Sequence, residues 1–180
     1  MFRGNVSSVS FYTRTVDAEP LLGEVARRFH EASLEAVLIG NAAAALQGAP
    51  VTTVDFDFLF RKTPRNLQKM KAVARALQAT ILRPYYPVSE LYRIVRDEDG
   101  LQVDLMATIH GIRSFAGLRD RATRMEFGGA PLLVAALDDI ITSKRAAGRP
   151  RDRAVLDILE ASRDKTTEPS GTARRPRTRK

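Results

Sequence analysis

The sequence predicts an α+β domain in which helices pack against a small mixed β-sheet. Segments with apolar residues at helical spacing alternate along the chain with short apolar runs of the length that strands have. The stretch Asp97-Glu98-Asp99-Gly100 lies between two such runs and is a clear signal for a hairpin turn. At 180 residues and without internal repeats, the chain is about one domain with a real core.

The first elements follow from apolar spacing. Helical spacing predicts a helix over Ala18–Ala32, and the short apolar run Ala36–Ile39 predicts a strand. The Ala-rich segment that follows predicts a short helix, Asn41–Gln47. The chain enters this helix through Gly40 and leaves it at Gly48, because glycine suits a C-terminal cap.

A second apolar run, which contains two aspartates, predicts a strand over Val54–Phe60. Thr63 can cap a helix N-terminus and Pro64 suits the first helical position, so together they predict the start of a basic amphipathic helix, Pro64–Gln78. The later elements are the hairpin strands Tyr92–Arg96 and Leu101–Ala107, the short strands Thr123–Phe127 and Leu132–Ala135 after a weakly patterned region, and the helices Leu137–Ala147 and Pro150–Ser162.

The composition excludes several classes of chemistry. The chain has no cysteine, which rules out a disulfide framework, a thiol nucleophile and a thiolate metal site. Its two histidines, His30 and His110, leave little room for a histidine zinc site. Any metal would therefore be a hard cation held by carboxylates: magnesium, manganese or calcium. No apolar run reaches the roughly 18 residues of a membrane span, and the N-terminus lacks a signal-peptide core, so we expect a cytoplasmic protein without a membrane partner.

Positive charge is concentrated at the C-terminus. The chain has a net charge of +8, and residues 161–180 hold seven basic against two acidic residues, which is +5 of that charge. This segment is rich in Ser, Thr, Pro and Gly and has no large apolar residue. We therefore expect residues 1–162 to form the domain and residues 163–180 a disordered basic tail. The tail is either an arm for a polyanion such as RNA or a solubilising segment.

Two aspartates stand in the strand Val54–Phe60. Strand side chains alternate, so Asp55 and Asp57 share one face while Phe56 and Phe58 face the core on the other. The two carboxylates are then roughly 6–7 Å apart, close enough to share a divalent cation that relieves their repulsion. Asp-x-Asp alone is short and frequent, and it also fits the solvated face of an edge strand.

Two further features make the metal interpretation more specific. Gly40-Asn41 lies at a strand-to-helix junction, where free backbone N–H groups suit phosphate oxygens. In Leu101–Met106, Asp104 faces the side opposite to Val103 and Leu105. If this strand lies beside Val54–Phe60, Asp104 joins the aspartate pair to form a triad.

In combination these features resemble the nucleotidyltransferase-fold superfamily. The resemblance rests on Gly40-Asn41, Gly48, the motif Thr53-Val54-Asp55-Phe56-Asp57 and the later Asp104. The closing stretch Leu137–Leu159 resembles the Lys-containing helix and "GR-x-KD" turn of bacterial minimal nucleotidyltransferases and AbiEii-type toxins. The resemblance spans roughly Leu21 to Leu159 and implies the polymerase-beta-like fold.

The resemblance also implies the chemistry of the carboxylates. Asp55 and Asp57 would hold two Mg²⁺ ions, or Mn²⁺, that bridge a nucleoside triphosphate. Asp104 would bind the second ion and help to activate the acceptor hydroxyl. In-line attack on the α-phosphorus would release pyrophosphate.

The remaining implied roles concern the nucleotide. Gly40, Asn41 and Thr53 would line the triphosphate, and Lys144 would neutralise its charge, unless Lys144 is an exposed helix residue. Arg149 would contact phosphate or, as the residues slightly favour, pair with Asp152 to fix the last two helices.

The sequence departs from the family pattern at two positions. Asn41 stands where relatives have Ser or Gly, and Val51 stands where many have Arg, which removes one phosphate or sugar contact. All three carboxylates are present, which favours an active enzyme over an inactive relative.

The sequence says least about which molecule accepts the transferred nucleotide. Basic stretches at Pro64–Lys71, Arg113–Arg124 and the tail favour RNA, and the toxin resemblance favours tRNA with an antitoxin as partner. The same fold also serves antibiotic and other small-molecule acceptors, and a non-catalytic RNA- or partner-binding module is the third hypothesis.

Overall fold

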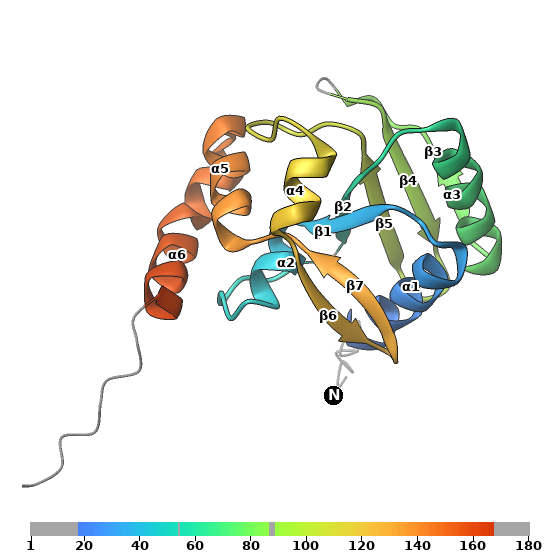
Figure 1. The fold of residues 1–180 in the computed structure, drawn as a ribbon, viewed down its shortest axis with the longest axis horizontal. Helices are drawn as coiled ribbons and strands as arrows, with labels where there is room; N and C mark the ends of the chain where they lie inside the picture. The colour runs from blue at the N-terminus through green and yellow to red at the C-terminus, as the bar shows by residue number, and fades with distance from the viewer. Residues whose placement is uncertain (1–17, 54, 87–88, 168–180) are drawn as a thin grey trace, which may run out of the picture.

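The structure, a computed structural model, describes residues 18–53, 55–86 and 89–167. Within these ranges seven strands form one sheet in the order β3-β4-β5-β2-β1-β7-β6 (Figure 1). The strands are β1 Ala36–Ile39, β2 Phe56–Phe60, β3 Thr80–Leu82, β4 Leu91–Arg96, β5 Leu101–Met106, β6 Thr123–Phe127 and β7 Ala130–Val134. The helices are α1 Ala18–Ala32, α2 Gly40–Ala45, α3 Pro64–Ala76, α4 Phe115–Arg121, α5 Leu137–Ala147 and α6 Pro150–Thr167.

The sheet is mixed, as predicted. β2 pairs in parallel with β5 and β1 in parallel with β7, whereas the other neighbouring pairs are antiparallel. The hairpin of β4 and β5 turns at Asp97–Gly100, where Gly100 has a φ of 75°. The predicted α+β class is therefore confirmed.

The core follows from the alternation of side chains along β2. Phe58 and Phe60 are fully buried, and the Phe58 ring lies 4.8 Å from the ring of Phe29 in α1. Helix α1 therefore covers the face of the sheet opposite to Asp57. This confirms the predicted anchoring role of the phenylalanines; Val54 lies outside the described residues.

Figure 1 shows α1 and α3 at one end of the molecule and α5 and α6 at the other, with α2 and α4 between them. Helix α3 begins as predicted, because Thr63 Oγ1 accepts a hydrogen bond from the Asn66 backbone N–H and Pro64 is the first helical residue. None of the described helices is long and apolar enough to cross a bilayer.

Several element ends differ from the prediction. Helix α2 starts at Gly40 and is capped at Leu46, while Gly48 adopts its φ of 87° two residues later. Strand β2 starts at Phe56, so Asp55 stands in a bend just before it. Strand β3 was not predicted.

Helix α6 continues to Thr167, five residues past the predicted end at Ser162. Near this end Arg163 lies 3.6 Å from Asp138 of α5 and 2.8 Å from Asp164, in ion pairs whose carboxylates are exposed. Residues 168–180 lie outside the described residues, so the division into residues 1–162 and a basic tail stays a prediction.

Candidate active site

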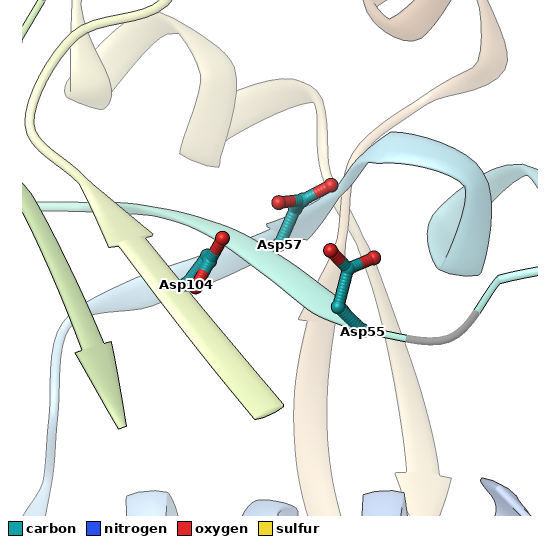
Figure 2. Close-up of side chains that lie close together, drawn as sticks. All are labelled: Asp55, Asp57 and Asp104. Carbon is teal, nitrogen blue, oxygen red and sulfur yellow. The ribbon is translucent and has the colours of Figure 1, made fainter. Parts of the chain in front are cut away.

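The three predicted aspartates lie together on one face of the sheet. Asp57 of β2 and Asp104 of β5 are direct neighbours in the parallel register, and Asp55 precedes β2 in its bend. One carboxylate oxygen from each lies within 4.8 Å of the others. Figure 2 shows the three side chains together. We call these three residues the aspartate triad. Its carboxylate oxygens are the donors that Mg²⁺ and Mn²⁺ prefer.

The surroundings of Asp57 perturb its titration. Its pKa is raised from 3.8 to about 7, mainly because burial disfavours the charged form, and further because Asp55 and Asp104 are negative neighbours. Lys144 and Arg151 act in the opposite sense. A bound divalent cation would offset this repulsion, so the donor set and its electrostatics both fit a hard metal.

Gly40 lies directly against Asp57. Its φ is 69°, and a Cβ added there would lie 2.6 Å from Asp57 Oδ2. Glycine is needed both for the backbone conformation and for the close approach. The predicted glycine of the strand-to-helix junction therefore borders the triad.

Asn41 and Thr53 shape the chain around Asp55. The Asn41 amide Nδ2 donates to the Thr52 carbonyl at 3.1 Å, and its Oδ1 is buried without a hydrogen-bond partner among the described residues. The Thr53 hydroxyl donates to the Asp55 carbonyl at 2.7 Å, which stabilises the bend. One amide hydrogen of Asn41, a residue that we expected to line the triphosphate, is thus engaged by the Thr52 carbonyl.

A cavity of about 710 Å³ lies over the triad. All eight residues singled out in the sequence line it: Gly40, Asn41, Thr53, Asp55, Asp57, Asp104, Lys144 and Arg149. Its other lining residues include Tyr85, Tyr86, Arg93, Arg151 and Asp152. Residues from distant parts of the chain therefore meet in one concave site.

Lys144 is not an exposed helix residue. Its side chain is only 13% exposed, and its Nζ lies 3.4 Å from Asp152 Oδ1 of α6. Arg149 instead donates from Nη2 to the Tyr86 hydroxyl at 2.8 Å, and its Nε is 4.0 Å from Asp152 Oδ2. Asp152 thus contacts Lys144 and, at a longer distance, Arg149 as we expected, while Arg145 and Glu160 also join the last two helices at 2.7 Å.

Two polar residues at the triad were not singled out from the sequence. Arg93 of β4 donates from Nε and Nη2 to the two carboxylate oxygens of Asp104, each at 2.7 Å. Gln102 of β5 donates to Asp55 Oδ2 at 3.2 Å. Counting outward from the turn Asp97–Gly100 pairs residue 96 with 101 and residue 93 with 104, so the hairpin signal could have identified Arg93.

Among the described residues, the predicted basic stretches contribute no lysine or arginine to the cavity lining, although Leu118 of Arg113–Arg124 lines it. No residue of Pro64–Lys71 lines the cavity, and α3 follows the end of β2 that lies away from Asp57. In the stretch Arg113–Arg124, Arg121 is paired with Asp139 at 2.7 Å. The lysine and arginine side chains that line the cavity are Arg93, Lys144, Arg149 and Arg151.

No protein-family model and no curated protein matches the chain. Several solved structures do match it. The lincosamide antibiotic adenylyltransferase LnuA, solved with lincomycin bound, aligns with a TM-score of 0.55 at 12% identity over 81% of this chain and 97% of its own. The antibiotic-resistance factor ANT(2'')-Ia aligns with a TM-score of 0.54 at 13% identity over 83% and 90%.

A proposed nucleotidyltransferase from Thermotoga maritima aligns with a TM-score of 0.51 at 17% identity over 87% of this chain and 95% of its own. At such identities the likeness shows the fold alone. The chain has the nucleotidyltransferase fold, which is the fold that the sequence resemblance implies.

Proposed function

We propose that this chain is a divalent-metal-dependent nucleotidyltransferase that moves a nucleoside monophosphate from a nucleoside triphosphate to an acceptor hydroxyl. The observation that carries the proposal is the aspartate triad, whose oxygens approach within 4.8 Å under a cavity that also contains Lys144, Arg149 and Arg151. Carboxylates for hard cations and basic groups for phosphate thus share one site.

The residues divide the chemistry between them. When bound, two Mg²⁺ or Mn²⁺ ions would neutralise charge on the attacking and leaving oxygens. Asp55 and Asp57 supply their carboxylate ligands, and Asp104 also accepts the proton of the acceptor hydroxyl. The hydroxyl oxygen bonds to the α-phosphorus as the bond to the β-phosphate oxygen breaks, and pyrophosphate leaves. Lys144, Arg149 and Arg151 face the triphosphate, while Gly40, Asn41 and Thr53 border it.

RNA, and tRNA in particular, is the acceptor that the sequence favours. The net charge of +8 supports it, as do Arg149 and Arg151 at the cavity. A toxin role with an antitoxin partner stays a proposal that rests on the resemblance of Leu137–Leu159 alone.

A small-molecule acceptor is the second candidate. A cavity of about 710 Å³ lies in the range of small-ligand sites. The structures of LnuA and ANT(2'')-Ia were solved with lincomycin and adenylyl-2''-tobramycin, respectively. The basic stretch Pro64–Lys71 also lies away from the cavity, which weakens one reason to favour RNA.

The test is transfer of label from each α-labelled nucleoside triphosphate, with Mg²⁺, to total bacterial RNA or to a panel of aminoglycosides and lincosamides. The Asp55→Asn/Asp57→Asn variant should lose transfer, whereas Asp157→Asn, an exposed aspartate outside the cavity, should keep it. Label on RNA or on a small molecule identifies the acceptor class. If no label moves and calorimetry detects no Mg²⁺-dependent nucleotide binding, the catalytic proposal fails and the binding-module hypothesis replaces it.

A further inference from the structure

The ion pair of Arg93 and Asp104 lies across the β4–β5 hairpin on the floor of the cavity. The two residues stand directly opposite each other in the antiparallel register, and both bonds of the guanidinium fork measure 2.7 Å. The Asp104 side chain is 7% exposed and that of Arg93 is 32% exposed. Since Arg93 itself lines the cavity, this pair belongs to the site and not to the protein surface.

Among the described residues, Arg93 is the basic residue that forms an ion pair with the aspartate triad. Gln102, the contact of Asp55, is neutral, and the ion pair of Lys144 is with Asp152. The guanidinium therefore provides the direct positive charge beside three carboxylates that lie within 4.8 Å of one another. Such a charge offsets part of their mutual repulsion.

The fork has a geometric effect as well. Because it binds both oxygens, it fixes the plane of the Asp104 carboxylate. Each carboxylate oxygen has two lone pairs, so each retains one for a metal ion or a hydroxyl proton. Arg93 and a metal ion can therefore hold Asp104 at the same time, but their positive charges repel each other.

We propose that Arg93 is a positioning residue that aims the Asp104 carboxylate and weakens divalent-cation binding at the triad until a triphosphate is present. The triphosphate brings the negative charge that offsets Arg93, so full metal loading accompanies nucleotide binding. The inference rests on the proposed function for the role of Asp104. Lysine cannot replace arginine in full, because a single ammonium cannot form the fork.

The test compares the native chain with Arg93→Met and Arg93→Lys by thermal unfolding in EDTA and in MgCl₂, and by calorimetric titration of Mg²⁺ without nucleotide. Arg93→Met should unfold at a lower temperature than the native chain in EDTA, and MgCl₂ should raise its unfolding temperature by more. It should also bind Mg²⁺ at least about fivefold more tightly. Arg93→Lys keeps the charge, so its Mg²⁺ affinity should stay within about twofold of native while label transfer falls about tenfold.

A merely structural ion pair predicts a different pattern. Arg93→Met would then lower the unfolding temperature equally in EDTA and in MgCl₂ with an unchanged Mg²⁺ affinity, and that result would overturn the inference. Arg145→Met is the matched control, since Arg145 pairs with Glu160 at 2.7 Å outside the cavity, and it should leave the Mg²⁺ response native.

The two proposals fail in distinguishable ways. If Mg²⁺ in the presence of a nucleoside triphosphate raises the unfolding temperature of the native chain no more than that of Asp55→Asn/Asp57→Asn, the metal site and the proposed function fail. If the native Mg²⁺ response is normal and the Arg93 variants share it, only the Arg93 inference fails. Should Arg93→Met not fold in either buffer, Arg93→Gln serves for the same comparison.

Discussion

Asp57 is the residue at which the effect of the site on the free energy of unfolding can be measured most directly. Its folded-state pKa of about 7 exceeds the ordinary value, so the folded protein holds this proton more tightly than the unfolded chain does. The free energy of unfolding therefore falls as pH rises from about 4 to 7 and stays lowered above that.

Replacing the Asp57 carboxylate by a neutral amide should remove this pH-dependent loss of stability. Asp57→Asn is expected to raise the free energy of unfolding in EDTA at pH 8 by at least about 1 kcal/mol, with a much smaller gain at pH 5. Denaturant unfolding at the two pH values measures the difference. Equal gains at both would contradict a raised Asp57 pKa, and the variant should in either case lose label transfer.

Gly40 is a second residue whose substitution should have a measurable effect on stability. Gly40→Ala combines an unfavourable φ of 69° with a contact of 2.6 Å to Asp57 Oδ2, and we expect it to lower the free energy of unfolding by about 2–4 kcal/mol. Asp57 should also be displaced, so the Mg²⁺-dependent rise in unfolding temperature should shrink.

Gly48→Ala is the matched control for this variant. Gly48 has a comparable φ of 87°, but a Cβ there would meet nothing within 4 Å. It should therefore show the backbone strain alone, about 1–2 kcal/mol, with a native Mg²⁺ response. A similar loss of the Mg²⁺ response in both variants would mean that the contact with Asp57 does not matter.

At the scale of elements, the Lys144–Asp152 pair joins α5 to α6. Both side chains are largely buried, at 13% and 10% exposed. Removing one partner leaves an uncompensated charge away from water, so Asp152→Ala should lower the free energy of unfolding by about 3 kcal/mol. The double variant Lys144→Met/Asp152→Leu should recover much of that stability while label transfer stays low. Chemical denaturation of the single and double variants provides the test, and equal destabilisation by both would argue against the pair.

Elements with strong local signals were predictable to the residue. Helices α1 and α5 begin and end where the apolar spacing placed them, and Thr63 caps α3 as expected. Strand β3 was missed because three residues, Thr80–Leu82, are too few to show a period.

The residues of the candidate site also differ in how far local sequence patterns could predict them. The two aspartates of one motif needed only strand alternation, and Asp104 needed the assumption that two strands are neighbours. Arg93 depends on exact cross-strand register, and the burial of Lys144 depends on how α6 packs on α5. Counting that register outward from the turn Asp97–Gly100 could have identified Arg93, whereas the packing of α6 on α5 joins separate elements and is not revealed by composition or local spacing.

At the scale of the whole molecule, charge placement separates the two candidate acceptors. Residues 168–180 carry five basic residues and one acidic residue, which is +4 of the net +8, and they lie outside the described structure. If RNA is the acceptor, a chain ending at Thr167 should lose at least about tenfold in transfer efficiency at physiological salt. If a small molecule is the acceptor, the same truncation should leave the transfer rate within about twofold.

The position of β2 in the sheet has a consequence for motion. It is the fourth of seven strands, with three on either side, and it carries Asp57 between β1 and β5. Amide hydrogens in the middle of a sheet exchange mainly through large-scale unfolding, so we expect slow exchange in the strands that carry Asp57 and Asp104. Lys144, Arg149 and Arg151 come instead from α5, α6 and the turn between them, at the end of the fold. We therefore expect adjustment to substrates of different size at Lys144, Arg149 and Arg151, while the carboxylates keep a constant geometry.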